Sequence, residues 1–339
     1  MLLDAQLEGG VASAATQARL AERAGFAGAW AAEVTRDPML TLAAAAGSTT
    51  SMTIGSNVVL AFSRNPMSVA MQAWDLADAT DGRFVLGLAT QVKPHITRRF
   101  SMPWSDPVGK MREFVDALRH IFEVFQGEHP LDFRGQHYSH TLLHGMFNPG
   151  PIAHPRIPIG LGGVGPHLTA LAGELGDGYL LHAFTNIAYQ DKVSLPALDR
   201  GLAVSGRTRA DIWVFGYLML AIGDTEEAQA RAADRIRSQI AFYASSPMYR
   251  EVLDCIGCAE LQTDLHRLVK AGRWAELPGI VDDGVLDHFV LRGTLEELPA
   301  RIHARYGGYY DRAVPYLALE GVEPDRLAQF VAAVGAPPG

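Results

Sequence analysis

A glycine-rich segment near the middle of the chain could hold an anion. The apolar run 157–161 leads into Gly162-Gly163-Val164-Gly165, and a helix-forming run follows over residues 167–175. Glycines let backbone N–H groups approach an anion closely, and the start of a helix favours negative charge. These residues predict a phosphate cradle. A tight turn without a ligand is the alternative, because Leu168 stands where a dinucleotide fingerprint has its last glycine.

Two apolar runs nearer the amino terminus carry polar side chains. Glu33 ends the run 27–32 and could act as an acid, a base or a polar anchor. A capping or solvated carboxylate is the alternative. Ser56-Asn57 interrupts the run 53–62, which is unusual for a buried strand. The alternative for this pair is that two polar side chains simply point into the interior of a barrel.

Histidines recur in the loops after the expected strands, at positions 95, 137, 140, 144, 154, 167 and 182. His140 and His144 are four residues apart, as in a helical zinc pair, but they fall in an expected surface loop and not on a helix, so we predict no metal site. His95 follows one expected strand and His182 ends another, and both are candidates for a functional site. A structural role is equally compatible with each of them.

The two cysteines, Cys255 and Cys258, are separated by two residues. A zinc site would need two more ligands, and a thioredoxin-like motif would follow a strand and open a helix. Neither context is present in the sequence. We therefore interpret the pair as two reduced thiols in a helical region.

The elements that position these residues alternate regularly between strand and helix. An apolar strand over 53–62, a helix over 67–80 and a strand over 84–89 form a parallel βαβ unit, because only a sheet covered on both faces needs such apolar strands. Four βα units fit into roughly the first hundred residues. Further strands are expected at 157–161, 179–183 and 212–222, and further helices at 111–125, 167–175 and 195–205.

Two regions depart from this alternation. Residues 126–156 form a long segment rich in His, Gly and Pro, which indicates a functional loop or an insertion. Residues 224–285 read as a helical insertion, followed by a helix over 295–306. The segments 212–222, 289–291 and 314–319 compete for the last strand positions. We predict a (β/α)8 TIM barrel that forms a single domain over residues 1–339.

Composition excludes several classes of function. The chain has 339 residues, of which 48% are hydrophobic and 19% charged, as in a well-packed globular protein. Its net charge of −8 argues against nucleic acid as a partner. No apolar run approaches the roughly 20 residues that cross a bilayer, and the first residues lack the pattern of a signal peptide. We expect a cytoplasmic protein that binds neither nucleic acid nor a membrane.

Several strings resemble the bacterial-luciferase-like flavin and deazaflavin oxidoreductases. They are Arg64-Asn65-Pro66, Asp81-Gly82-Arg83-Phe84 and Leu86-Gly87-Leu88. The segments 91–100, 242–247 and 305–307 are similar to a subgroup that depends on the deazaflavin coenzyme F420. The resemblance implies a TIM barrel with a cofactor at its mouth. It also implies that residues 159–165 surround the phosphate of the cofactor.

On this resemblance we expect coenzyme F420 as the cofactor, with FMN as the alternative. The implied catalytic residues are Glu33 and His95. The implied cofactor-binding residues are Ser56, Asn57, Thr90, Gln91, Gly163, Val164, Gly165, His182, Ala183 and Phe184. Many deazaflavin-dependent relatives have a histidine after the acidic residue of strand 2, whereas Val34 follows Glu33 here, which puts a sugar-phosphate dehydrogenase in doubt.

The F420-dependent relatives also contain a non-proline cis peptide bond in strand 3, and we place it at Ser56–Asn57, with Gly55–Ser56 as the second choice. The predicted reaction is hydride transfer between the deazaflavin and a small organic substrate, catalysed by a homodimer. An FMN-dependent monooxygenase is the alternative from the same family. A cofactor-binding protein without turnover is the alternative from another class.

Overall fold

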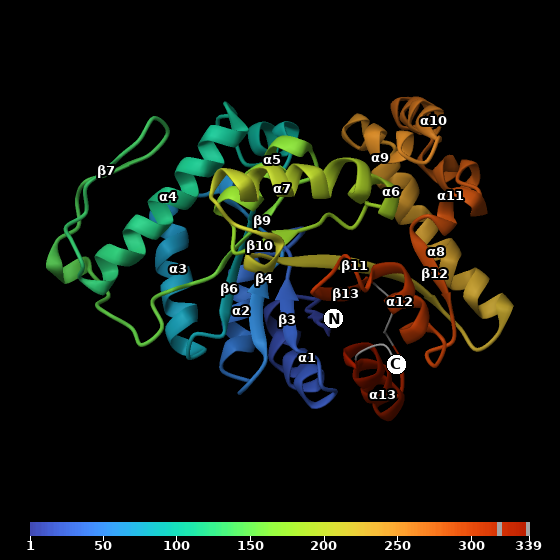
Figure 1. The fold of residues 1–339 in the computed structure, drawn as a ribbon, viewed down its shortest axis with the longest axis horizontal. Coiled ribbons are helices and arrows are strands. Elements are labelled where there is room, and N and C mark those ends of the chain that lie inside the picture. Colours follow the sequence, from blue (N-terminus) through green and yellow to red (C-terminus); the bar gives the residue numbers. More distant parts are fainter. Residues whose placement is uncertain (317–320, 337–339) are drawn as a thin grey trace. The chain divides into compact units, whose positions relative to one another are not determined.

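The apolar segment Phe84–Ala89 forms strand β6, which lies inside a parallel sheet between β4 and β9. The computed structural model describes residues 1–316 and 321–336. The chain divides into two compact units, which are described separately (Figure 1). The first unit comprises Ala5–Leu180 and Leu198–Trp213, and the second comprises Met1–Asp4, Leu181–Ala197 and Val214–Gly339.

The first unit contains a parallel sheet. Its strands are β2 (Ala5–Gln6), β3 (Gly28–Ala31), β4 (Thr53–Ser56), β5 (Val59–Leu60), β6, β9 (Ile159–Gly162) and β10 (Gly178–Leu180). They pair in the order β2-β3-β4-β6-β9-β10, and β5 pairs with β6. The sequence prediction of strand 84–89 is confirmed without a shift, and the strands expected at 27–32 and 157–161 correspond to β3 and β9.

The predicted strand 53–62 is wrong as a single element. The strand β4 ends at Ser56. A separate short strand, β5, follows, and then a 3-10 turn, η1, covers Ala61–Ser63. The cause is local: the Ser56 hydroxyl donates to the Gly87 carbonyl at 2.9 Å and accepts from the Gly87 N–H at 2.8 Å. The Ser56 side chain thus occupies the N–H and carbonyl groups of Gly87, which a continuous neighbouring strand would use for backbone pairing.

Helices cover the sheet of the first unit. They are α1 (Val11–Arg23), α2 (Pro38–Ala46), α3 (Pro66–Ala79), α4 (Pro107–Gln126), α5 (Pro166–Leu175) and α7 (Leu195–Val204), the last of which begins in the second unit. From α1 to α5, each helix packs against the next one in chain order, as the outer helices of a barrel do (Figure 1).

The starts of these helices follow from the sequence. Asn65 accepts a hydrogen bond from the Ser68 N–H at 3.0 Å, and Pro66 occupies the first helical position of α3. Asp37 caps α2 in the same way, through the Met39 N–H at 2.8 Å. The predicted loop 126–156 is largely irregular; it contains the small antiparallel pair β7 (Phe133–Arg134) and β8 (Ser139–His140) and the turn η3 (Gly145–Phe147).

The second unit contains the remaining strands. They are β1 (Leu2–Leu3), β11 (Trp213–Ile222, beginning in the first unit), β12 (Val290–Gly293) and β13 (Arg312–Tyr316). The long strand β11 pairs in parallel with β13 through its first half and with β12 through its second half, and β13 also pairs with β1. All three late segments that competed for strand positions are therefore strands. The end of the strand expected at 314–319 lies outside the described residues.

Helices dominate the rest of the second unit. They are α6 (Ile187–Tyr189), α8 (Glu226–Ala244), α9 (Arg250–Asp254), α10 (Ala259–Lys270), α11 (Asp283–Asp287), α12 (Leu298–Tyr306) and α13 (Pro324–Gly335), with shorter turns η4 (Gln190–Ser194), η6 (Pro247–Tyr249) and η7 (Trp274–Ile280). Residues 224–285 are helical as expected. The helix α13 is not predicted from the sequence, and it packs against α12 and β1.

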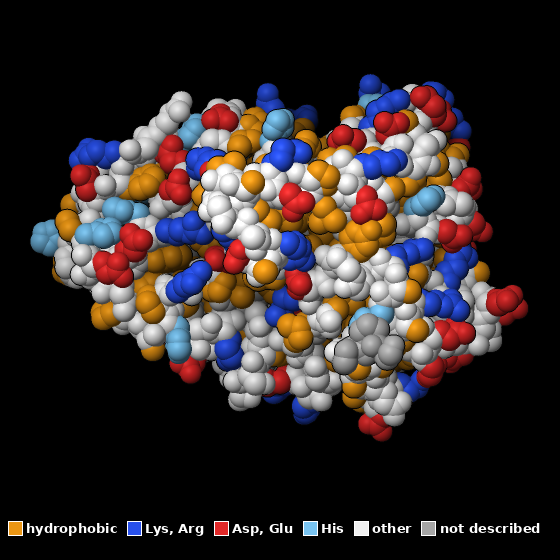
Figure 2. Space-filling view, viewed as in Figure 1, with side chains coloured by type: hydrophobic (Ala, Val, Ile, Leu, Met, Phe, Trp, Pro, Cys, Tyr) orange, Lys and Arg blue, Asp and Glu red, His pale blue; other side chains and the backbone are white. Residues whose placement is uncertain are grey.

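Basic and acidic side chains are interspersed over the visible surface of α8 to α11 (Figure 2). Ion pairs join some of them, such as Arg237 with Asp283 at 2.6 Å and Arg250 with Glu260 at 3.3 Å. Among the described residues, no helix combines the length and the apolar character that a membrane crossing requires.

Candidate active site

The predicted residues of the first unit gather at one end of its sheet. Glu33 follows β3, Asn57 follows β4, Thr90 follows β6, and the glycine segment begins at the end of β9. These strands are neighbours in the sheet and run in the same direction, so their carboxyl ends lie side by side. A Cβ atom added to Gly162 would lie 3.4 Å from the Val58 side chain, which shows how closely the ends meet.

Glu33 takes part in a network that sequence analysis missed. Its carboxylate accepts a hydrogen bond from the Leu60 N–H at 2.9 Å and pairs with the Arg64 guanidinium at 3.0 Å. Arg64 also pairs with Asp37 at 3.1 Å. The Glu33 side chain is 8% exposed. Burial lowers the pKa of Arg64, but the two carboxylates outweigh burial and raise it. The contacts make Glu33 an anchor for the start of η1, and its catalytic role remains a prediction.

The non-proline cis peptide bond lies at Asn57–Val58. Our placement at Ser56–Asn57 was wrong by one bond, and the second choice at Gly55–Ser56 was wrong as well. Regular pairing with β3 explains the difference. Ser56 still stands opposite Ala31 in the ladder, and the Asn57 N–H still donates to the Ala31 carbonyl at 2.9 Å. The backbone therefore leaves the strand only after Asn57.

The Ser56 hydroxyl is engaged with the backbone of Gly87 as both donor and acceptor. Both of these interactions are buried, and the Ser56 residue has no exposed surface. Ser56 therefore joins β4 to β6. Asn57 lies beside it at the strand end and is 8% exposed.

Thr90 and Gln91 directly follow β6. Gln91 has a φ of 60°, a left-handed conformation that residues other than glycine adopt uncommonly. Its side-chain oxygen accepts from the Val92 N–H at 2.9 Å, and the Thr90 hydroxyl donates to the Gln91 carbonyl at 2.9 Å. Strained backbone of this kind is concentrated at functional sites, which makes this corner a candidate for ligand contact.

The glycine segment has the form that a phosphate cradle needs. Gly165 is the N-cap of α5, and a Cβ atom added to it would meet no atom within 4 Å. At Gly163, in contrast, a Cβ atom would lie 2.8 Å from the Leu168 side chain, so only glycine lets the loop pass so close to the helix. The Tyr179 hydroxyl donates to the Gly163 carbonyl at 3.0 Å and fixes the turn. Val164 lies between the two glycines.

His95 opens a π-helical turn, η2 (His95–Arg99), in the loop after β6. Its side chain is exposed. From the same turn, the Arg99 guanidinium donates to the Val34 carbonyl at 2.7 Å, so η2 contacts the loop that carries Glu33. The catalytic role of His95 remains a prediction.

His182, Ala183 and Phe184 belong to the second unit, where His182 lies in a group of aromatic side chains. The Phe184 N–H donates to His182 Nδ1 at 3.0 Å, so the neutral ring carries its proton on Nε2 and donates it to the Tyr249 hydroxyl at 3.1 Å. Burial lowers the pKa of His182 to about 4. The ring of Tyr249 stacks on His182, with 5.0 Å between the ring centres.

The neighbours of His182 are packed as a hydrophobic core. Phe184 is fully buried and stacks on Phe289 with ring centres 4.7 Å apart, and Ala183 is 8% exposed. Tyr243 meets His182 edge-on at 4.9 Å and shares a hydrogen bond with Tyr316 at 3.1 Å. Tyr249 is not predictable as a neighbour of His182, because a tyrosine in a helical segment carries no functional signal by itself. The cofactor-binding roles of these residues remain predictions.

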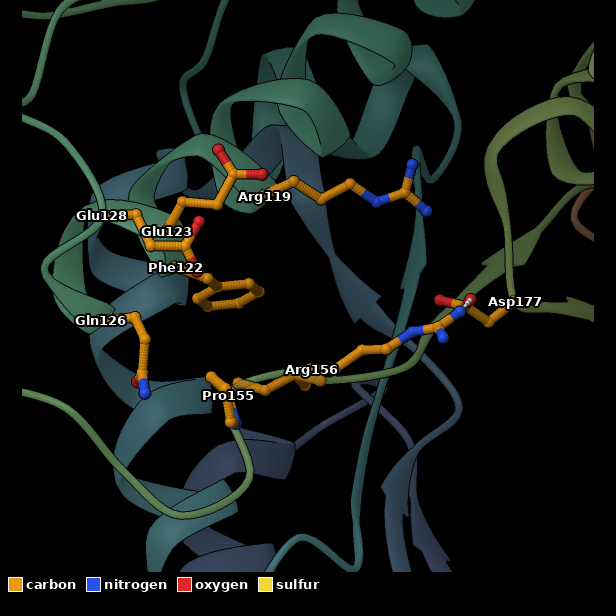
Figure 3. A pocket seen from close by; sticks show the side chains of 9 residues that line it. Arg119, Phe122, Glu123, Gln126, Glu128, Pro155, Arg156 and Asp177 are labelled. Carbon is orange, nitrogen blue, oxygen red and sulfur yellow. Dashed lines mark ion pairs between the residues drawn. The ribbon is translucent and has the colours of Figure 1, made fainter.

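A cavity of about 330 Å³ lies at the opposite ends of the first unit's strands (Figure 3). Its lining residues come from α4, from the turn after it and from the segments before β9 and β10; they include Arg119, Phe122, Glu123, Arg156 and Asp177. Barrel enzymes carry their catalytic groups at the carboxyl ends of the strands, so this cavity is not the candidate active site.

The cysteines lie in the helical part of the second unit, at the end of α9 and just before α10. Both are free thiols. Burial raises the pKa of Cys255, which makes its thiol less reactive than an ordinary one. Cys258 donates to the Ile256 carbonyl at 3.5 Å.

Comparison with known proteins identifies the family of this chain. The luciferase-like monooxygenase family matches residues 3–312. The chain belongs to this family. A related uncharacterized protein of Mycobacterium tuberculosis is 42% identical over 313 residues, covering 92% of each chain. A putative coenzyme F420-dependent oxidoreductase of the same species is 28% identical over 298 residues, covering 82% of this chain and 83% of the relative.

A solved structure of another protein has a similar fold. It is the coenzyme F420-dependent tetrahydromethanopterin reductase of Methanopyrus kandleri, with a TM-score of 0.78 and 20% sequence identity. The match covers 98% of this chain and 97% of that chain. The predicted TIM-barrel fold is thereby confirmed, and the resemblance that the sequence motifs carried is confirmed at the level of the family.

Proposed function

We propose that this protein is an oxidoreductase that binds coenzyme F420 at the carboxyl ends of β3, β4, β6 and β9. Hydride would pass between the deazaflavin and a small organic substrate. Relatives and structural neighbours that are named for F420 support this choice of cofactor. The protein is expected to act in the cytoplasm as a homodimer.

The glycine segment before α5 is the observation that carries the proposal. Residues 162–167 contain no carboxylate, and Gly165 leaves open space beside the amino terminus of a helix of 10 residues. Backbone N–H groups at such a terminus favour an anion. The residues therefore fit the phosphate of a flavin or deazaflavin cofactor. Gly163, Val164 and Gly165 would hold it.

The other strand ends would position the ring system. When bound, the deazaflavin supplies the hydride chemistry, and the protein supplies binding and orientation. Thr90 and Gln91 present a fixed backbone corner at the end of β6. Glu33 and Arg64 hold the segment around Leu60, which follows the cis bond. Ser56 keeps β4 and β6 at a constant separation through Gly87.

An FMN-dependent monooxygenase is the second candidate, because the matched family is described as luciferase-like monooxygenases. FMN also carries a phosphate, so the glycine segment fits either cofactor. A third reading is a protein that binds the cofactor without turnover.

Binding of the two cofactors separates these readings. Purified protein is titrated with F420 and, separately, with FMN, while absorbance and fluorescence are followed. We expect F420 to bind at least about tenfold more tightly, equivalent to a difference of about 1.4 kcal/mol. Tighter binding of FMN would favour the monooxygenase, and binding of neither would remove the proposal. Reduced F420 that binds but is oxidised by none of a panel of small carbonyl compounds would indicate binding without turnover.

A further inference from the structure

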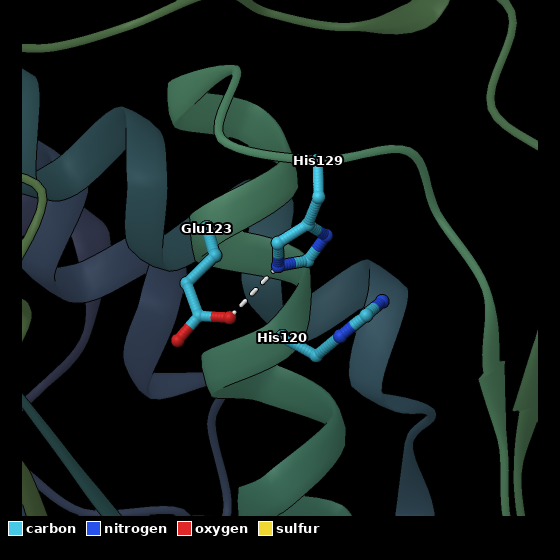
Figure 4. Close-up of side chains that lie close together, drawn as sticks. All are labelled: His120, Glu123 and His129. Carbon is cyan, nitrogen blue, oxygen red and sulfur yellow. Dashed lines mark hydrogen bonds and ion pairs between the residues drawn. The ribbon is translucent and has the colours of Figure 1, made fainter.

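The carboxyl end of α4 brings together three side chains that sequence analysis did not connect. His120 and Glu123 are three residues apart on the helix and share one face of it. His129 comes from the turn that follows the helix. One ligand atom from each of the three lies within 4.8 Å of the others (Figure 4).

The backbone holds His129 over the helix. Gly127 has a φ of 88°, which ends α4 in a left-handed conformation. The Glu128 N–H then donates to the Glu123 carbonyl at 3.0 Å, and the Gly127 N–H donates to the Val124 carbonyl at 3.0 Å. This pair of hydrogen bonds is a Schellman motif. It turns the chain back so that the next residue, His129, faces Glu123.

The side chains already point at one another. His129 Nε2 lies 2.9 Å from the Glu123 carboxylate, and Figure 4 shows these two groups meeting beside the His120 ring. The ring centres of His120 and His129 are 4.5 Å apart. His129 Nδ1 lies 3.2 Å from the Pro130 carbonyl, which is the kind of contact that orients a metal-binding histidine.

We propose that His120, Glu123 and His129 bind a divalent transition-metal ion of the zinc, nickel or copper class. Two imidazoles and one carboxylate are the donors such ions take, with water at the remaining position. Metal–ligand bonds of about 2.0–2.2 Å place ligand atoms roughly 3.3 Å apart in a tetrahedron. The present separations of up to 4.8 Å reach that geometry by small side-chain rotations.

The site is open to solvent and separate from the candidate active site. The side chains of His129 and Glu123 are 34% and 50% exposed, so an ion can enter. Glu123 also lines the cavity at the amino ends of the strands. Bound metal would fasten the start of the 126–156 loop to α4. The inference is independent of which cofactor the protein uses.

Metal binding is tested on untagged protein that has been treated with a chelator and dialysed. Titration with Zn²⁺ in competition with a chromophoric chelator should show one ion bound per chain. His120→Gln, Glu123→Gln and His129→Gln should each weaken binding by about tenfold or more. Zn²⁺ should also raise the midpoint of thermal unfolding of the wild type, because it binds the folded state.

The matched control is His144→Gln, which removes an exposed histidine of the same loop and should bind Zn²⁺ like the wild type. Unfolding of each variant without metal shows that it is folded before it is titrated. A wild type that binds no Zn²⁺ at about 100 µM would overturn the proposal. Unchanged affinity in folded His120→Gln or His129→Gln would overturn it as well, because binding would then occur elsewhere.

Discussion

Ser56 and Gly87 exchange two hydrogen bonds across neighbouring strands, one from the hydroxyl to the carbonyl at 2.9 Å and one from the N–H to the hydroxyl at 2.8 Å. The space for this exchange exists only because residue 87 has no side chain. A Cβ atom at that position would lie 1.9 Å from the Ser56 backbone oxygen. The glycine of Leu86-Gly87-Leu88 is thus explained by packing at the base of the candidate site.

Gly87→Ala should destabilise the fold by about 3 kcal/mol or more, because the methyl group meets rigid backbone and cannot be accommodated by a side-chain rotation. Chemical denaturation measures the change in the free energy of unfolding. Gly145→Ala is the control, since a Cβ atom there meets nothing within 4 Å and the residue is exposed. A Gly87→Ala protein as stable as the wild type would refute the close approach.

Gly165→Leu should weaken cofactor binding by at least about tenfold and leave stability within about 0.5 kcal/mol of the wild type. The added side chain fills open space beside the helix terminus, where the phosphate is proposed to lie. Gly163→Ala should behave differently and lower stability, since its methyl group meets Leu168. Titration with F420 and thermal unfolding are compared for both. Wild-type affinity in folded Gly165→Leu would exclude this loop from the site.

Regular elements were predictable because their signals are local. Phe84–Ala89 is an uninterrupted apolar run between turn residues, and Asn65-Pro66 gives a cap and a first helical position. The predicted helix 67–80 therefore differs from α3 by one residue at each end. The ends of these strands were predictable for the same reason, so Glu33 and the glycine segment 162–165 were placed after strands from local patterns, whereas Thr90 was placed by the family resemblance.

Long-range partners were not predictable from local patterns. Arg64 stands 31 positions after Glu33, and nothing in the sequence indicates that its guanidinium reaches that carboxylate. The cis bond was misplaced because it follows the last residue whose N–H bonds to the Ala31 carbonyl of β3. The small size of the residues before that bond does not determine its position. His120 and His129 were overlooked because a glycine turn, rather than a helical repeat, brings them together.

Glu33→Gln tests whether this carboxylate takes part in the reaction. If it does, turnover with F420 should fall at least about 100-fold, the lower range for loss of an acid or base. Stability should change less, because the amide oxygen can still accept the Leu60 N–H. Asp37→Asn is the matched control: it removes the other charge beside Arg64 and can still cap α2. Equal losses of turnover in the two variants would indicate that Arg64 needs its charge partners, and that Glu33 is not catalytic.

His182 should make the stability of the protein depend on pH. Burial lowers the pKa of its ring from 6.5 to about 4, because the surroundings disfavour the charged form. The rings of Tyr243 and Tyr249 face it, and burial raises the pKa of Tyr249. The unfolded chain binds a proton below about pH 6.5, whereas the folded chain does so only near pH 4. The stabilising contribution is therefore complete above pH 6.5 and is lost as the pH falls towards 4.

The size of this contribution is about 2–3 kcal/mol between pH 7 and pH 4.5, since each unit of pKa difference is worth about 1.4 kcal/mol. His182→Asn should abolish that part of the pH dependence while its amide oxygen continues to accept the Phe184 N–H. His144→Asn, on an exposed loop, should leave the dependence unchanged. Denaturation midpoints at several pH values measure the contribution of His182 to the pH dependence, because the wild type and His182→Asn share all other titrating groups. A His182→Asn protein that loses as much stability as the wild type on acidification would show that His182 accepts its proton in the folded state as readily as in the unfolded one.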